Sequence, residues 1–120
     1  MNILIAEDQY VIQMMLELTI VELGFSCDIV SNGLEAVRQA KEKPGLYDLC
    51  IMDVSMPVMN GIEATRIIRE EMDYFPILGY CADIFMEDLC LDVGMDAFMH
   101  KPCSRDELLG VILELCGKRR

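Results

Sequence analysis

The chain alternates between short apolar runs and longer stretches in which apolar residues recur at helical spacing. Uninterrupted apolar runs at residues 2–6, 49–53 and 77–82 are typical of strands buried on both faces of a sheet. The run at residues 25–30 alternates weakly, as an edge strand would, and a short run at residues 97–99 ends before Lys101 and Pro102. The pattern therefore predicts five strands.

Helices are predicted between and after these strands. Gly24 provides a stop for the first helix. Asn32 with Glu35, and Ser104 with Glu107, have capping-box spacing and mark the starts of two further helices. Basic residues 118–120 suit the negative end of the last helix dipole. The first predicted helix ends near residue 23. The other four span about residues 33–43, 62–72, 86–93 and 108–115.

Strands that alternate with helices in this way indicate parallel βαβ units with right-handed crossovers. The sequence has no repeat, linker or low-complexity segment, and 120 residues suit one domain. We therefore expect an α/β fold that occupies residues 1–120 as a single domain.

Composition narrows the choice of compartment and partner. The net charge of −11 argues against a direct nucleic-acid partner, because phosphate backbones repel an acidic surface. No apolar run approaches the length of a membrane span, and the first residues lack a secretory signal, so we expect no membrane contact. None of the six cysteines forms a C-x-x-C pair, which makes zinc unfavourable and indicates free thiols in the cytoplasm.

Charged residues follow three of the predicted strands. Glu7 and Asp8 come after the first strand, Asp53 ends the third, and Lys101 follows the fifth. Taken alone, Asp53 could equally start a turn. Together these groups should meet, because the carboxyl ends of parallel strands lie at one edge of a sheet. Carboxylates gathered there suit Mg²⁺, Lys101 would balance their charge, and the combination favours phosphoryl transfer onto an aspartate.

These residues resemble the receiver domain of two-component response regulators, and the likeness covers essentially the whole chain. The run Glu63-Ala64-Thr65-Arg66 is most similar to receivers of hybrid histidine kinases. The motifs that carry the resemblance are Ile3-Leu4-Ile5-Ala6-Glu7-Asp8, Asn32-Gly33-Leu34-Glu35-Ala36, Asp48-Leu49-Cys50-Ile51-Met52-Asp53, Met56-Pro57-Val58-Met59-Asn60-Gly61 and Lys101-Pro102.

The resemblance implies a doubly wound, flavodoxin-like sheet of five parallel strands in the order 2-1-3-4-5. It implies that Asp53 accepts a phosphoryl group from a histidine kinase or phosphotransfer protein, with Mg²⁺ as cofactor. Asp8, Asp53 and the Ser55 backbone carbonyl would hold the metal, Glu7 would act on it through water, and Lys101 would contact the phosphoryl group. Phe98 matches an aromatic switch position of the family, although a plain core aromatic is the alternative.

Cys81 departs from the family, which usually has Thr or Ser at that position. A thiol donates a weak hydrogen bond, whereas a hydroxyl donates well to a phosphoryl oxygen. The hypothesis is that Asp53 is still phosphorylated but that the conformational response is damped. Alternatively, Cys81 merely packs and another donor replaces it. A pseudo-receiver that is never phosphorylated and acts as an interaction module is the main alternative function.

Enzymes are disfavoured by the same residues. A phosphatase of the haloacid dehalogenase type would need a second Asp where Ser55 stands, and a flavodoxin-like flavin binder would need a phosphate-cradling loop where Glu7-Asp8-Gln9 would repel phosphate. His100 is expected to face away from the site. We therefore expect a signalling domain that at most promotes its own phosphorylation and dephosphorylation.

The first helix carries two apolar stripes. A helix that lies on one face of a sheet should bury only one of them. The second stripe is a candidate docking surface for the helices of a kinase or phosphotransfer protein, unless neighbouring helices half bury it. The stripe expected to be buried contains Ile12, Met15, Leu16, Ile20 and Leu23, and the second contains Val11, Met14, Leu18 and Val21.

Overall fold

The computed structural model describes residues 1–117, and its centre is a parallel sheet in the order β2-β1-β3-β4-β5. The α/β class is the one that the sequence pattern predicts, and the strand order is the one that the family resemblance implies. The two edge positions are taken by β2, which alternated weakly in the sequence, and by the short β5. The strands are β1 (Asn2–Ala6), β2 (Ser26–Val30), β3 (Leu49–Asp53), β4 (Ile77–Cys81) and β5 (Ala97–His100).

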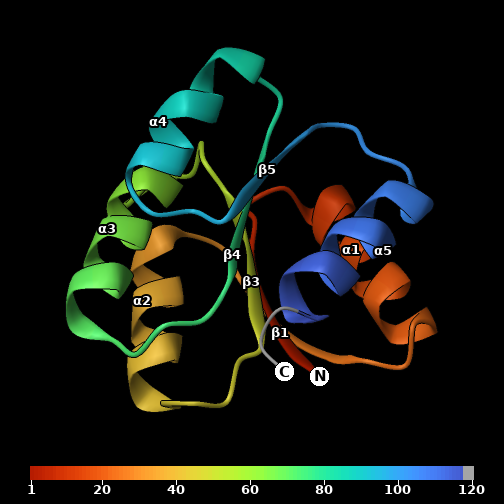
Figure 1. The fold of residues 1–120 in the computed structure, drawn as a ribbon, viewed down its shortest axis with the longest axis horizontal. Helices are drawn as coiled ribbons and strands as arrows, with labels where there is room; N and C mark the ends of the chain where they lie inside the picture. The colour runs from red at the N-terminus through yellow and green to blue at the C-terminus, as the bar shows by residue number, and fades with distance from the viewer. Residues whose placement is uncertain (118–120) are drawn as a thin grey trace.

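Helices cover both faces of the sheet, as Figure 1 shows, with α1 and α5 on one side and α2, α3 and α4 on the other. A 3₁₀ turn, η1, leads directly into α4. Among residues 1–117, no helix has the length and apolar character needed to cross a membrane. The helical elements are α1 (Tyr10–Glu22), α2 (Gly33–Glu42), α3 (Gly61–Glu71), η1 (Ile84–Met86), α4 (Glu87–Asp92) and α5 (Arg105–Gly117).

Alternate residues of the central strands enter two separate cores. Ile3 and Ile5 of β1 pack with α1 and α5, whereas Leu4 and Ala6 pack with the α2–α3–α4 side. All five residues of β3 and all five of β4 are buried. Burial on both faces explains why these strands read as continuous apolar runs, and each fully buried large side chain contributes about 1.5–3 kcal/mol.

Side-chain caps fix where several helices begin. The Asn32 side chain accepts a hydrogen bond from the Glu35 N–H at 2.9 Å, and Ser104 Oγ accepts one from the Glu107 N–H at 3.1 Å, which confirms both predicted caps. The fourth helix, α4, begins at Glu87, close to the predicted start at about residue 86. The sequence did not predict the 3₁₀ turn η1 before it, which starts where Asp83 accepts from the Phe85 N–H at 3.0 Å. The predicted basic end, residues 118–120, lies outside the described residues.

Candidate functional site

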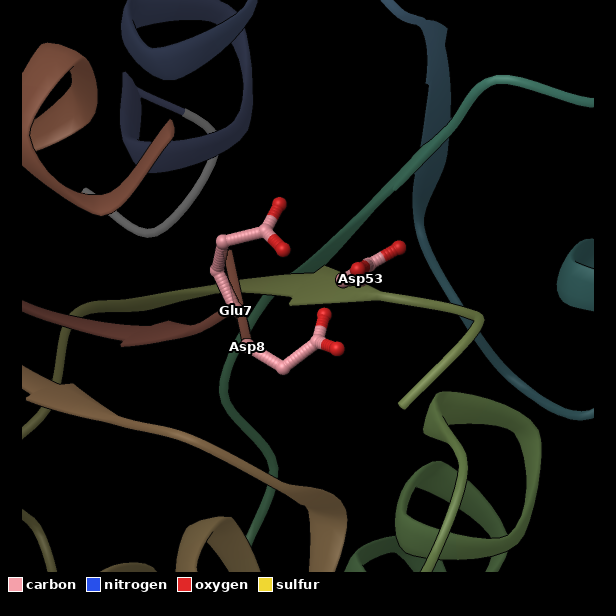
Figure 2. A group of neighbouring side chains, drawn as sticks. All are labelled: Glu7, Asp8 and Asp53. Atoms are coloured by element: carbon pink, nitrogen blue, oxygen red, sulfur yellow. The ribbon is translucent and has the colours of Figure 1, made fainter. Parts of the chain in front are cut away.

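Three carboxylates meet at the carboxyl edge of the sheet. Glu7 and Asp8 follow β1, and Asp53 is the last residue of β3. Figure 2 shows the three side chains pointing toward one another, and each offers an oxygen within 4.8 Å of the others. Glu7 and Asp53 are buried, with 1% and 4% exposure, whereas Asp8 is exposed. The sequence argument correctly brought these three residues together.

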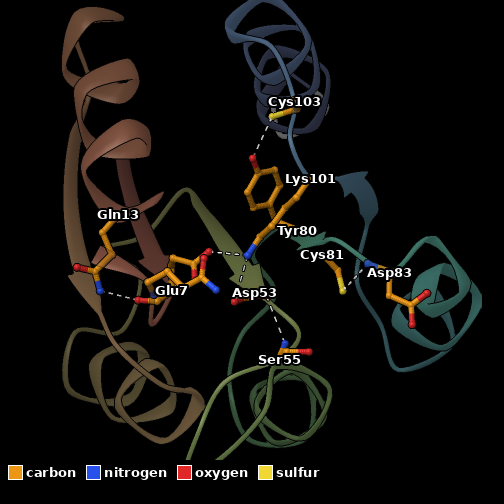
Figure 3. A network of polar contacts seen from close by, with 10 residues as sticks. Glu7, Gln13, Asp53, Ser55, Tyr80, Cys81, Asp83, Lys101 and Cys103 are labelled. Atoms are coloured by element: carbon orange, nitrogen blue, oxygen red, sulfur yellow. Dashed lines mark hydrogen bonds and ion pairs between the residues drawn. The ribbon is translucent and has the colours of Figure 1, made fainter. Parts of the chain in front are cut away.

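Lys101 provides the positive charge for this cluster. Its Nζ lies 2.7 Å from Glu7 Oε1 and 3.2 Å from Asp53 Oδ2, as Figure 3 shows. Burial alone would lower the pKa of Lys101, but the Glu7 hydrogen bond and the charges of Asp53 and Glu7 raise it above its ordinary value. The ammonium therefore stays charged, and the half-buried Lys101 contacts two of the three carboxylates, Glu7 and Asp53.

Backbone groups around β3 place the Asp53 side chain. The Ser55 N–H donates to Asp53 Oδ1 at 3.3 Å. The first residue of α3, Gly61, donates to the Val54 carbonyl at 2.9 Å, and a Cβ at this position would strike the Asp53 carbonyl oxygen. Gly61 is therefore needed for the close approach of α3 to the end of β3. In the sequence it entered only as the last residue of a motif that carries the family resemblance.

A groove of about 500 Å³ opens beside the acidic cluster. Asp8 and Ser55 line one part of it, and Met86 and Leu89 line the α4 side. The loop between β3 and α3 forms its outer lip, where Val58 has φ +69° and is 78% exposed. Asp8 connects this open, partly apolar groove to the acidic cluster.

The donor set fits a hard divalent cation. Carboxylate oxygens within 4.8 Å of one another can share one ion, and the exposed Asp8 leaves room for water ligands, which Mg²⁺ keeps. Glu7 is already paired with Lys101 and accepts from the Gln9 N–H at 3.1 Å. These contacts suit Glu7 to an indirect role, through water, which is the role that the family resemblance implies.

Two further candidate residues lie on the α4 side of the cluster. Cys81 is buried at the end of β4, and its Sγ accepts from the Asp83 N–H at 3.4 Å; Figure 3 shows the sulfur turned toward the Asp83 backbone. Phe98 is half-buried and packs against the core beneath α2, α3 and α4. His100 is exposed and its Nε2 contacts the Ala82 carbonyl at 2.6 Å, so it points to a backbone group and not to the carboxylates.

The exposed face of α1 corresponds to the second apolar stripe. Leu16 and Ile20 are buried against the sheet, as predicted. The prediction that Met15 is buried was wrong: it is 58% exposed and lines a small pocket between α1 and the start of α5, because only a narrow strip of the helix touches the sheet. The second stripe is exposed throughout, with 68% for Val11, 51% for Met14, 61% for Leu18 and 58% for Val21.

Sequence reasoning missed one polar residue that touches the site. The Gln13 side chain donates to the Glu7 carbonyl at 2.5 Å, which ties the first turns of α1 to the end of β1. A single glutamine inside a helix has no sequence signature for such a contact.

Comparison with known proteins adds independent findings. The family model described as the response regulator receiver domain matches residues 3–113. Two-component system protein A of Emericella nidulans is 36% identical over 119 residues, which cover 97% of this chain and 17% of that protein. The chain spans at most 17% of the length of the first curated relatives it matches.

Solved structures resemble the fold closely. The receiver domain of a Pseudomonas aeruginosa sensor histidine kinase, with a magnesium ion coordinated in its active site cleft, has a TM-score of 0.89 and 34% identity over 97% of both chains. A co-crystal structure of a Saccharomyces cerevisiae histidine phosphotransfer signaling protein with the receiver domain of its downstream response regulator gives a TM-score of 0.91 and 27% identity, covering 99% of this chain and 90% of that chain.

Proposed function

Because this chain belongs to the response regulator receiver domain family, we propose that it accepts a phosphoryl group on Asp53 from a histidine kinase or phosphotransfer protein. The observation that carries the proposal is the position of the Asp53 carboxylate, which contacts the Lys101 ammonium and shares one cluster with Glu7 and Asp8. A receiver 34% identical to this chain has magnesium in its cleft, which supports a Mg²⁺-dependent reaction here.

The reaction is a transfer between two covalent phosphoryl carriers. An Asp53 carboxylate oxygen forms a bond to phosphorus while the bond from phosphorus to the donor's histidine nitrogen breaks. The bonding electron pair leaves on the imidazole nitrogen, and the product is an acyl phosphate on Asp53. Lys101, 3.2 Å from Asp53 Oδ2, is placed to attract a phosphoryl oxygen as charge shifts toward the carboxylate.

Magnesium supplies charge neutralisation for the phosphoryl oxygens when it is bound. Asp8, Asp53 and the Ser55 backbone carbonyl would hold it, with Glu7 acting through water. The role of these residues is to supply oxygen ligands at the carboxyl edge of the sheet. Glu7 also orients Lys101 through the 2.7 Å contact between them.

The domain acts as an acceptor in a phosphorelay and not as an enzyme with an external substrate; its own groups promote only its phosphorylation and dephosphorylation. The six cysteines form no disulfide bond within residues 1–117, which supports a place in the reducing cytoplasm.

The phosphodonor docks on the exposed face of α1. Val11, Met14, Leu18 and Val21 give this face four exposed apolar side chains, and exposed apolar patches often mark partner sites. The yeast complex of a phosphotransfer protein with a receiver shows that a relative of this fold binds such a partner, which supports the assignment of partner class.

Phosphorylation by a small donor tests the proposal directly. The protein is incubated with acetyl phosphate and Mg²⁺ and its intact mass is measured, with Asp53→Asn and the exposed, distant Asp73→Asn as matched variants. We expect one added phosphoryl group on wild type and on Asp73→Asn, and none on Asp53→Asn. Phosphoryl uptake by Asp53→Asn would disprove the assignment of the acceptor.

A non-phosphorylated interaction module is the second candidate. The one observation that favours it is Cys81, whose sulfur accepts a hydrogen bond from the Asp83 N–H and which has no hydroxyl to donate to a phosphoryl oxygen. The same mass measurement separates the two functions, because a pseudo-receiver gains no mass in wild type.

A further inference from the structure

Gln13 of α1 donates a hydrogen bond to the backbone carbonyl of Glu7, and we propose that it is a positioning residue for Asp8. The inference deepens the proposed function and rests on it. Gln13 touches neither the reacting oxygen nor the three clustered carboxylate oxygens. It acts through the backbone turn on which Asp8 stands.

Glu7 makes most of the hydrogen bonds that hold this turn. Its N–H donates to the Val30 carbonyl at 3.0 Å, and its carbonyl accepts from Gln13 Nε2 at 2.5 Å. Its two carboxylate oxygens accept from Lys101 at 2.7 Å and from the Gln9 N–H at 3.1 Å. Both polar backbone groups and both side-chain oxygens of Glu7 are therefore used, and Glu7 is only 1% exposed.

Asp8 lies between two of these tethers. The Glu7 carbonyl held by Gln13 belongs to the peptide that joins Glu7 to Asp8, and a peptide is planar, so fixing its oxygen fixes the plane that ends at the Asp8 Cα. On the other side, the Gln9 N–H is tied back to the Glu7 carboxylate. The Asp8 side chain is exposed, so packing does not place it and the backbone must.

Gln13 also joins this turn to a neighbouring strand end. Its Nε2 lies 3.5 Å from Ser31 Oγ, and Ser31 directly follows β2. The Gln13 N–H donates to the Gln9 carbonyl at 2.9 Å, so the same residue fixes the first turn of α1 through its backbone. Loss of the side chain leaves that backbone bond intact and frees the Glu7 carbonyl and the Ser31 hydroxyl.

The test is the affinity for Mg²⁺, measured by NMR titration of the full chain at fixed ionic strength with no phosphodonor present. Gln13→Leu and Gln13→Glu both lack the donor, and both residues are good helix formers. We expect the Mg²⁺ Kd of each to rise about tenfold, as is common when a residue that orients a metal ligand is lost. Gln13→Lys keeps a donor and should bind Mg²⁺ as wild type does.

Comparison of Gln13→Glu with Gln13→Lys tests whether the effect on Mg²⁺ affinity is purely electrostatic. If Gln13 acted only through local charge, Gln13→Glu would bind Mg²⁺ more tightly and Gln13→Lys more weakly, which is the opposite order. Gln39→Leu on α2, where Gln39 Nε2 contacts Tyr47 at 3.3 Å far from the cluster, is the matched control and should leave the Kd unchanged. Thermal unfolding in EDTA shows that each variant is folded.

The outcomes separate this inference from the proposed function. Wild-type affinity in Gln13→Leu and Gln13→Glu, or the electrostatic order, would overturn the role of Gln13 while leaving the magnesium site intact. Absence of any Mg²⁺ response in wild type would overturn both.

Discussion

Replacing Asp8 with Asn should stabilise the metal-free protein and remove most of its response to magnesium. Glu7 and Asp53 both contact Lys101, whereas the exposed Asp8 adds a third negative charge to a cluster with one ammonium. Without a bound metal ion, the negative charge of Asp8 repels the charges of Glu7 and Asp53. Asn keeps the size of the side chain and removes the charge.

The magnitude follows from the spacing of the carboxylates. At a separation of 4.8 Å, two unit charges repel by about 3.5 kcal/mol at an effective dielectric constant of about 20, and by about 0.9 kcal/mol in bulk water. Because Asp8 is exposed, the lower figure applies to each pair, and attraction to Lys101 offsets one of the two repulsions. Asp8→Asn should therefore raise the free energy of unfolding in EDTA by about 1 kcal/mol.

Magnesium should reverse the order of stability, so that wild type has the higher free energy of unfolding and Asp8→Asn the lower. A ligand at about ten times its Kd stabilises the folded state by about 1.4 kcal/mol, and the variant loses a principal ligand. The measurement is urea unfolding followed by far-ultraviolet circular dichroism, since the chain has no tryptophan, in EDTA and in Mg²⁺. Asp73→Asn is the charge-matched control. The reasoning fails if Asp8→Asn is the less stable protein in EDTA, or if it gains as much from Mg²⁺ as wild type.

Three other predictions test the docking face, the Cys81 departure and the alkaline limit of stability. Met14→Glu combined with Leu18→Glu should slow phosphotransfer from a phosphotransfer protein at least about tenfold, because charges replace the apolar centre of the docking face. Acetyl phosphate should still phosphorylate that variant at the wild-type rate, as should both donors with Leu91→Glu on α4; equal slowing with both donors would contradict the docking assignment. Cys81→Thr should shift further toward the active state than wild type when a phosphate mimic is titrated and followed by NMR, because a hydrogen bond to a charged group contributes about 1.5–3 kcal/mol and a thiol donates weakly. Identical shifts would show that Cys81 is not what limits switching. Burial raises the pKa of Cys50 to about 12 from its ordinary 9.0, and Lys101 also has a raised pKa, so both groups hold a proton in the folded state that the unfolded chain releases. Their contribution is complete at pH values below 9.0 and is lost as pH rises toward 12, so urea midpoints should fall steadily over that range, and less steeply in Cys50→Ala; midpoints independent of pH would contradict this.

The strands of the sheet and the meeting of the charged residues could be predicted from the sequence, and the reason is physical. Apolar runs buried on both faces are unambiguous, and the parallel topology then sends Glu7, Asp53 and Lys101 to the same edge regardless of loop detail. Caps such as Asn32 were also readable, because the capping side chain and its helix are adjacent in sequence.

The remaining features depend on contacts that leave no pattern in the sequence. Met15 was misplaced because α1 is apolar on two sides, so periodicity alone cannot fix which side turns toward the sheet. The contacts of Gln13 and Gly61 were missed because their partners are backbone carbonyls, of Glu7 and Val54, and every residue has a carbonyl whatever its type.

The loop between β3 and α3, which forms the lip of the groove, contains one residue with a strained backbone. Val58 is β-branched, yet it adopts a left-handed backbone that disfavours such side chains, and the Gly33 N–H anchors the neighbouring Met59 carbonyl at 2.8 Å. The conformation of the loop between β3 and α3 is therefore fixed by its hydrogen bond to α2 and not by the backbone preferences of the loop residues. Glycine at position 58 would relax this segment without altering a single charge in the cluster, which makes it the place to engineer a sturdier domain that keeps its chemistry.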